Sequence, residues 1–132
     1  IKGKTAVVLG RSKLVGGPLK VMLEEAGPQV IQIHSQTPKP IDSLVQKGDI
    51  VISAVGQPKL VTADMIKKGA VVIDVGMNRE SETGKLTGDV DFEDVSKKAS
   101  LITPVPGGVG PMTVAMLMTN LVKATSLDNK IQ

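Results

Sequence analysis

Short apolar runs alternate with polar, turn-rich segments along the whole chain. Five runs, most of them rich in β-branched residues and bounded by Gly or Pro, predict strands at residues 5–9, 29–33, 49–55, 70–75 and 100–103. Helical spacing of apolar residues falls between them, so the chain predicts an α/β fold: a doubly wound parallel sheet of about five strands with helices on both faces. The short connection between the second and third strands predicts the spatial order 2-1-3-4-5.

The clearest helix signal follows the first strand. Pro18 stands where the first helical residue is expected, because its missing N–H costs nothing there. Gly27 can end this helix, and four apolar residues share its inner face: Leu19, Met22, Leu23 and Ala26. Short helices are also expected at residues 41–46 and 63–68.

The second half of the chain predicts a hairpin and two more helices. Residues 76–89 are polar and predict a surface hairpin about Thr83-Gly84-Lys85. Asp91 reads as the N-cap of a short helix with an apolar inner face of three residues: Phe92, Val95 and Ala99. The last helix, 112–124, is apolar over most of its surface, which predicts burial against a part of the protein outside this sequence. Residues 1–125 are therefore expected to form one domain, and residues 126–132 a polar tail.

Composition narrows the class of protein. The chain has 132 residues, one Phe, no Trp, Tyr or Cys, and a net charge of +3. No cysteine excludes disulfides and thiol chemistry, and scattered Lys and Arg without aromatic residues argue against a nucleic-acid partner. No apolar run is long enough for a membrane span, and no signal peptide is visible, so we expect an intracellular protein, cytoplasmic or mitochondrial. Asp74 and Asp89 lack an accompanying His or Glu set, which predicts solvated or capping carboxylates and no metal site.

A glycine turn joins the first strand to the first helix. Its spacing is Gly10-x-Ser12-x-x-x-Gly16, with Val15 before the last glycine. Backbone N–H groups and the positive end of the helix dipole would make this turn an anion cradle for phosphate. The turn alone is weak evidence, because any strand-to-helix turn can use glycine for positive φ.

The end of the second strand bears on the choice of dinucleotide. NAD-binding folds use an acidic residue here for the ribose 2′-hydroxyl, whereas a 2′-phosphate requires cations or hydroxyls. This chain has Ser35 and Thr37, no acid, and Arg11 on the facing turn, which favours NADP over NAD. His34 has two readings, a local hydrogen bond or a contact with the cofactor, and the first is favoured.

Two further glycine loops should meet at the carboxyl edge of the sheet, where ligands bind in open α/β folds. Gly56 directly follows Val55 at the end of the third strand. The fifth strand runs into a loop whose glycines would leave N–H groups bare to a ligand: Pro106, Gly107, Gly108, Val109 and Gly110. The alternative for this loop is a stiff connector.

These segments together resemble the methylenetetrahydrofolate dehydrogenase/methenyltetrahydrofolate cyclohydrolase family. The resemblance covers almost the whole chain and rests on VLGRSKLVG (8–16), HSQT (34–37), GDI (48–50), GQP (56–58) and, most specifically, TPVPGGVGPMT (103–113). It implies a Rossmann-type domain that holds NADP during hydride transfer from 5,10-methylenetetrahydrofolate, followed by hydrolysis of the methenyl product to 10-formyltetrahydrofolate. It also implies a homodimer built partly through this domain.

The resemblance also implies roles for individual residues. Phosphates would be held by Gly10, Arg11 and Ser12, with Arg11 and Ser35 at the 2′-phosphate. Met77 and Thr113 would approach the nicotinamide end. The residues from Pro106 to Gly110 would border the folate site.

The family's catalytic residues have no counterpart in this sequence. Its lysine, in a Tyr-x-x-x-Lys motif, belongs to an amino-terminal folate-binding domain, and this chain has no tyrosine. We therefore expect no catalytic residue here and little turnover from this polypeptide alone. The alternatives are a non-catalytic nucleotide-binding or interaction module and a relative of shikimate dehydrogenase, into which the Pro-Gly-Gly-Val-Gly-Pro loop is hard to fit.

Overall fold

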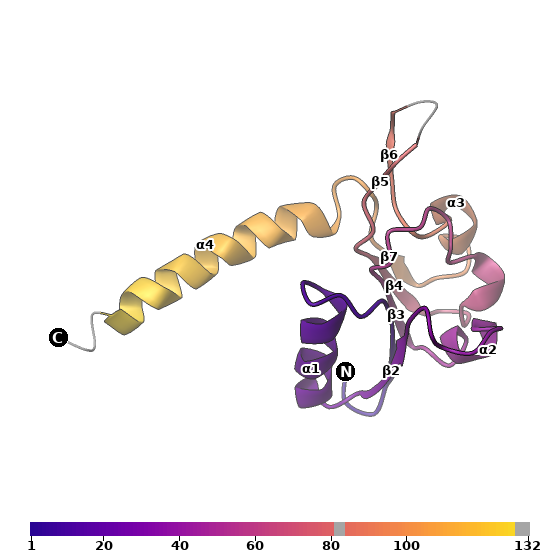
Figure 1. The fold of residues 1–132 in the computed structure, drawn as a ribbon, viewed down its shortest axis with the longest axis horizontal. Helices are drawn as coiled ribbons and strands as arrows, with labels where there is room; N and C mark the ends of the chain where they lie inside the picture. The colour runs from indigo at the N-terminus through magenta and orange to yellow at the C-terminus, as the bar shows by residue number, and fades with distance from the viewer. Residues whose placement is uncertain (81–83, 129–132) are drawn as a thin grey trace.

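A five-stranded parallel sheet forms the centre of the computed structural model, which describes residues 1–80 and 84–128 (Figure 1). The spatial order is β2-β1-β3-β4-β7, which confirms the predicted order. The strands are β1 (Thr5–Leu9), β2 (Gln29–Ile33), β3 (Ile50–Ser53), β4 (Val71–Asp74) and β7 (Leu101–Ile102). The first two match the predicted bounds, and the other three begin and end inside them.

Helices lie on both sides of this sheet, as predicted. The helix α1 (Gly16–Ala26) covers one side, and α2 (Asp42–Val45) and α3 (Phe92–Val95) cover the other (Figure 1). The expected helix at 63–68 is instead a 3₁₀ turn, η1 (Ala63–Met65). Two short antiparallel strands, β5 (Asn78–Arg79) and β6 (Leu86–Thr87), form the predicted hairpin. Thr83, at its expected tip, lies outside the described residues.

The prediction that α1 begins at Pro18 is wrong by two residues. The N–H of Leu19 donates to the carbonyl of Val15 at 2.9 Å, so helical hydrogen bonding begins upstream of the proline. Pro18 therefore lies within the first turn, where no intrahelical donor is needed.

The side chains of the strands alternate between two apolar layers. Val7, Val51 and Val72 stand in register and belong to the main core, with Val45 of α2 and Val95 of α3. On the opposite face, Val8 and Ile52 are also fully or almost fully buried. Both faces of the central strands are thus covered, which explains their continuous apolar sequences.

Three residues predicted to face the core are exposed. Met22 is 65% exposed and Ala26 is exposed, because α1 packs mainly on β1 and β2, at one edge of the sheet. Phe92 is 44% exposed, since the single turn of α3 directs Val95 inward instead. The Asp91 side chain also makes no capping hydrogen bond, contrary to the prediction.

The last helix, α4 (Val109–Asp128), extends away from the sheet (Figure 1). It begins three residues before the predicted start and continues past residue 125, where the domain was expected to end. Residues 110–126 are all exposed, so no described part of this chain provides the burial that their apolar composition predicts. None of the described helices is long and apolar enough to cross a membrane.

Candidate functional site

Close backbone packing determines where glycine must stand in the turn after β1. A Cβ on Gly10 would lie 2.4 Å from the carbonyl oxygen of Ala54, and Gly10 has φ +113°. A Cβ on Gly16 would lie 2.3 Å from the carbonyl oxygen of Gly10. Both glycines allow the turn to fold onto itself and onto the end of β3, beyond what a generic strand-to-helix turn requires.

The turn leaves several backbone donors available. The Ser12 hydroxyl oxygen accepts the N–H of Val15 at 3.2 Å, and the Ser12 carbonyl accepts the N–H of Gly17 at 2.9 Å. Within the described residues, the N–H groups of Arg11, Ser12 and Lys13 donate to no other group of the chain. Free amides beside the N-terminus of α1 are suited to an anion.

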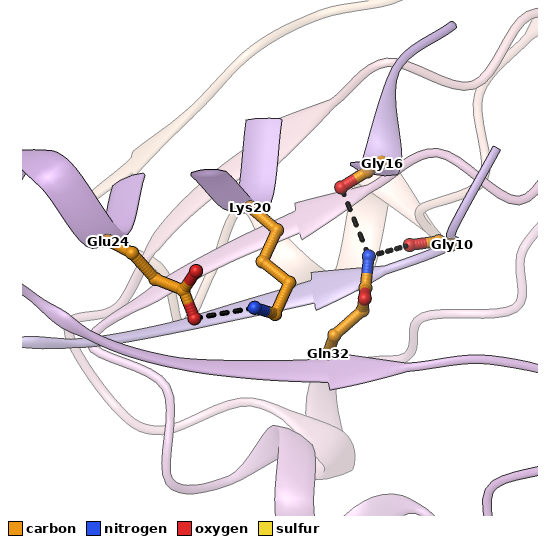
Figure 2. A network of polar contacts seen from close by, with 5 residues as sticks. All are labelled: Gly10, Gly16, Lys20, Glu24 and Gln32. Atoms are coloured by element: carbon orange, nitrogen blue, oxygen red, sulfur yellow. Dashed lines mark hydrogen bonds and ion pairs between the residues drawn. The ribbon is translucent and has the colours of Figure 1, made fainter. Parts of the chain in front are cut away.

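Gln32 on β2 holds both ends of this turn, as Figure 2 shows. Its amide nitrogen donates to the carbonyl oxygens of Gly10 and Gly16, each at 3.1 Å. The register explains this reach, because Gln32 pairs with Val8 and so faces the side of the sheet that α1 covers. Sequence reasoning missed this residue. A polar residue inside an otherwise apolar strand was the signal that could have found it.

A cleft of about 420 Å³ lies at the carboxyl edge of the sheet beside the turn. It brings together seven of the residues predicted to bind the cofactor: Gly10, Arg11, Ser12, His34, Ser35, Thr37 and Val55. Lys39 also lines it, and no carboxylate does among its described lining residues. The charge of this lining is thus suited to an anionic ligand. Of the remaining predicted cofactor residues, Val15, Gly16 and Gly56 lie next to this lining and not in it.

Hydrogen bonds organise the outer wall of the cleft. The Arg11 guanidinium donates to the side-chain oxygen of Gln36 at 3.0 Å, which connects the glycine turn to the loop after β2. The His34 ring accepts the N–H of Gln36 on Nδ1 at 3.2 Å, and the His34 N–H donates to the Thr37 hydroxyl at 3.0 Å. His34 therefore makes the local hydrogen bond that the sequence favoured, and it lines the cleft as well.

A second cleft, of about 460 Å³, contains the other predicted site residues. Met77 and Thr113 line it together with the whole glycine loop: Pro106, Gly107, Gly108, Val109 and Gly110. Met77 is 74% exposed, and the Thr113 hydroxyl donates to the carbonyl of Val109 at 3.3 Å. The loop is therefore more than a connector, since it forms one wall of a concave surface.

Asp74 and Asp89 are not solvated, which corrects the sequence prediction. Asp74 is 3% exposed and Asp89 is fully buried. The Asp74 carboxylate accepts the N–H groups of Gly76, Asp89 and Val90 at 2.9–3.0 Å. Burial raises the pKa of the Asp74 carboxyl above its usual value, against the lowering effect of these hydrogen bonds.

Glycines beside the two carboxylates make room for them. A Cβ on Gly76 would lie 2.2 Å from the Asp89 carboxylate, and one on Gly88 would lie 1.8 Å from that of Asp74. Among the described residues, no group of three or more His, Asp and Glu side chains could hold a metal ion. The two carboxylates therefore serve the backbone around the clefts.

A parallel sheet in this order, with a glycine turn and a cleft at its carboxyl edge, defines a Rossmann-like nucleotide-binding domain. Residues 1–129 match the family model "Tetrahydrofolate dehydrogenase/cyclohydrolase, NAD(P)-binding domain". The chain belongs to this family, as its NAD(P)-binding domain. It is 58% identical over 129 residues to the bifunctional protein FolD of Caldicellulosiruptor saccharolyticus, a match that covers 98% of this chain and 46% of that protein.

Solved structures agree in fold as well as in sequence. The FolD methylenetetrahydrofolate dehydrogenase/cyclohydrolase of Campylobacter jejuni has a TM-score of 0.92 at 50% identity, over 96% of this chain and 44% of that one. The Trypanosoma brucei enzyme, complexed with NADP and an inhibitor, has a TM-score of 0.86 at 47% identity, over 92% and 43%. This chain thus spans about half the length of these relatives. Such matches do not favour a non-catalytic module.

Proposed function

We propose that this chain binds NADP as the cofactor domain of a 5,10-methylenetetrahydrofolate dehydrogenase/5,10-methenyltetrahydrofolate cyclohydrolase. One observation carries the proposal. The cleft at the carboxyl edge combines the free amides of the glycine turn with Arg11 and Lys39, and its described lining has no carboxylate. Phosphates need amide donors and cations, and a ribose 2′-phosphate would be repelled by the acid that NAD sites use.

The proposal gives each predicted residue of the first cleft a role. The amides of Arg11 and Ser12, close to the backbone of Gly10, would hold the pyrophosphate, while the Arg11 guanidinium and the Ser35 hydroxyl would hold the 2′-phosphate. His34, Thr37 and Val55 would contact the adenosine half along the wall of the cleft. Three further residues next to the lining would hold the backbone of these residues in place: Val15, Gly16 and Gly56.

The second cleft would serve the reacting end. NADP supplies the hydride acceptor when it is bound. Met77 and Thr113 would border the nicotinamide, and Pro106, Gly107, Gly108, Val109 and Gly110 would border the tetrahydrofolate substrate. Their contribution would be to orient the two reactants and to exclude water, since no side chain of this chain is assigned the proton transfers.

The partners of this domain follow from the same proposal. Residues 1–125 would form the cofactor domain, and an amino-terminal folate-binding domain would supply the catalytic lysine. The chain covers less than half of its bifunctional relatives, which leaves room for such a domain. We also predict a homodimer, a cytoplasmic location and a polar tail at residues 126–132.

Calorimetric titration with NADP and with NAD at matched salt tests the proposal. We expect the chain to bind NADP more tightly than NAD, because Arg11 meets a 2′-phosphate only in NADP. Arg11→Ala should weaken NADP binding by at least about tenfold, equal to about 1.4 kcal/mol. The matched control is Lys13→Ala, which removes the same charge from the same turn at a residue that does not line the cleft. Equal or tighter binding of NAD, or no binding of either, would contradict the proposal.

A further inference from the structure

Asp89 lies outside the lining of both clefts. Its carboxylate nevertheless accepts hydrogen bonds from backbone groups of the first cleft and from Asn78, the residue next to Met77 in the second cleft. One carboxylate oxygen, Oδ2, accepts the Ser53 hydroxyl at 3.1 Å and the N–H groups of Val55 at 2.8 Å and Gly56 at 3.2 Å. The other, Oδ1, accepts the N–H of Gln57 at 3.0 Å and the Asn78 side-chain amide at 2.9 Å. Five donors thus meet one fully buried carboxylate.

Three consecutive N–H groups determine how the loop after β3 is turned. Each peptide group is planar, so an N–H that points at Asp89 directs the carbonyl of the same peptide group the other way. Val55 and Gln57, whose N–H groups are held in this manner, line the first cleft. The carboxylate therefore sets the orientation of the loop 55–57, one wall of that cleft, although Asp89 itself does not line the cleft.

The Asn78 contact reaches the second cleft. Asn78 opens β5 and directly follows Met77, which lines that cleft. The backbone of Asp89 is itself held, since its N–H donates to the Asp74 carboxylate at 3.0 Å. One buried side chain thus connects the loop 55–57 with the segment 76–78, which come from different strands and border different clefts.

We propose that Asp89 is a positioning residue for the cofactor. Its charge is balanced by dipoles of the two loops and not by a cation, because no ion pair of Asp89 exists among the described residues. The carboxylate consequently stabilises the arrangement in which these dipoles converge. In that arrangement, the loop 55–57 and the segment 76–78 are held in the positions from which they would contact the dinucleotide. The inference rests on the proposed function, since the ligand is the same.

The main test compares NADP affinity with stability in two variants of the chain. Asp89→Asn introduces an NH₂ group where only donors point, and should raise the Kd for NADP by about tenfold. Asn78→Ala removes one donor at a half-exposed position, keeps the fold, and should raise the Kd by about threefold. Both are measured well below the thermal midpoint of each variant, so that the titrations report folded protein.

Asp49→Asn is the matched control. Asp49 also holds the backbone, through the N–H of Thr5 at 3.0 Å, but it lies at the opposite edge of the sheet, far from either cleft lining. This variant should lose stability and keep the NADP affinity of the unmodified chain. In Asn78→Ala and Asp89→Asn, by contrast, amide hydrogen exchange at Val55, Gly56 and Gln57 should accelerate.

The outcomes separate this inference from the proposed function. If the unmodified chain binds neither NADP nor NAD, the proposed function fails and the inference fails with it. If it binds NADP, and Asn78→Ala and folded Asp89→Asn bind equally well, only the inference is overturned, because Asp89 then serves stability alone. Weaker binding with faster exchange in the loop 55–57, and no loss in Asp49→Asn, supports it.

Discussion

Gln32 shows how a single side chain can determine the shape of a binding turn. Its amide reaches two carbonyl oxygens, of Gly10 and Gly16, that lie six residues apart in the sequence (Figure 2). Because those carbonyls are held toward β2, the turn keeps its amides for an anion. The side chains of Lys20 and Glu24 on the adjacent helix pair with each other at 2.6 Å, separately from this contact (Figure 2).

Replacing Gln32 by Leu should therefore weaken both folding and NADP binding. Gln32→Leu retains the volume and leaves two carbonyl oxygens without their donor, at a cost of about 1–2 kcal/mol in stability. We expect NADP affinity, measured by calorimetry, to fall by about fivefold as the turn relaxes. Lys20→Met is the control, since an exposed ion pair contributes little. An affinity in Gln32→Leu equal to that of the unmodified chain would show that the turn keeps its shape without Gln32.

Asp74 gives a second prediction at the scale of one residue, concerning pH. Burial raises the pKa of this carboxyl above the usual value for aspartate, so the folded state binds the proton more tightly than the unfolded state does. Its contribution to stability is fully present below the usual pKa of aspartate and is lost as the pH rises through the raised pKa of the folded state. The difference in unfolding free energy between the unmodified chain and Asp74→Asn should therefore shrink as the pH rises across that window.

Urea unfolding followed by circular dichroism between about pH 3 and 7 measures this difference. Asp49→Asn provides a control of opposite sign. The hydrogen bond from Lys67, and then that from the Thr5 N–H, lower the pKa of Asp49, so its contribution is lost as the pH falls through the folded pKa. A constant difference for Asp74→Asn, or one that grows with pH, would contradict the burial argument.

At the scale of elements, the first and last helices differ in how they are packed. The helix α1 packs on β1 and β2, whereas residues 110–126 of α4 are exposed throughout. Large apolar side chains of α4 thus meet solvent, among them Met112, Leu117 and Leu121. Because burial is the main source of helix stability, α4 should contribute little to the stability of the sheet.

A chain that ends at Met116 tests this expectation. It retains every residue that lines the two clefts and should unfold at the same temperature as the whole chain, within the error of calorimetry. Val95→Ala is the comparison, because Val95 is fully buried and the substitution should cost about 2 kcal/mol and lower the midpoint by several degrees. A midpoint that falls as far in the shortened chain would show that α4 packs on the sheet in solution.

At the scale of the whole molecule, the two clefts open at the same edge of one sheet and belong to one proposed reaction. In the proposed function, the described residues would supply the cofactor wall and part of the substrate wall, while the relatives continue for about as much chain again. The exposed apolar surface of α4 is consistent with the proposed amino-terminal domain. The folate chemistry would therefore require both halves.

Sequence patterns determined the layout of the fold and much of the first cleft. Central parallel strands are buried on both faces, so their apolar runs marked them, and parallel strands ending at one edge predicted where His34 and Val55 would meet the glycine turn. Gly10 and Gly16 were visible because few other residues tolerate such close backbone packing. The helix ends and the inner faces of α1 and α3 were predicted less accurately, because they depend on how much of the sheet each helix covers.

Only the tertiary structure decided the roles of the buried polar side chains. The donors to Asp89 come from residues 11 to 36 positions away, and Gln32 reaches back 16 and 22 positions. The sequence around a carboxylate or an amide does not name its partners, and its burial is favourable only when distant backbone groups converge on it. Local sequence carries strand and turn preferences, and it does not carry that convergence.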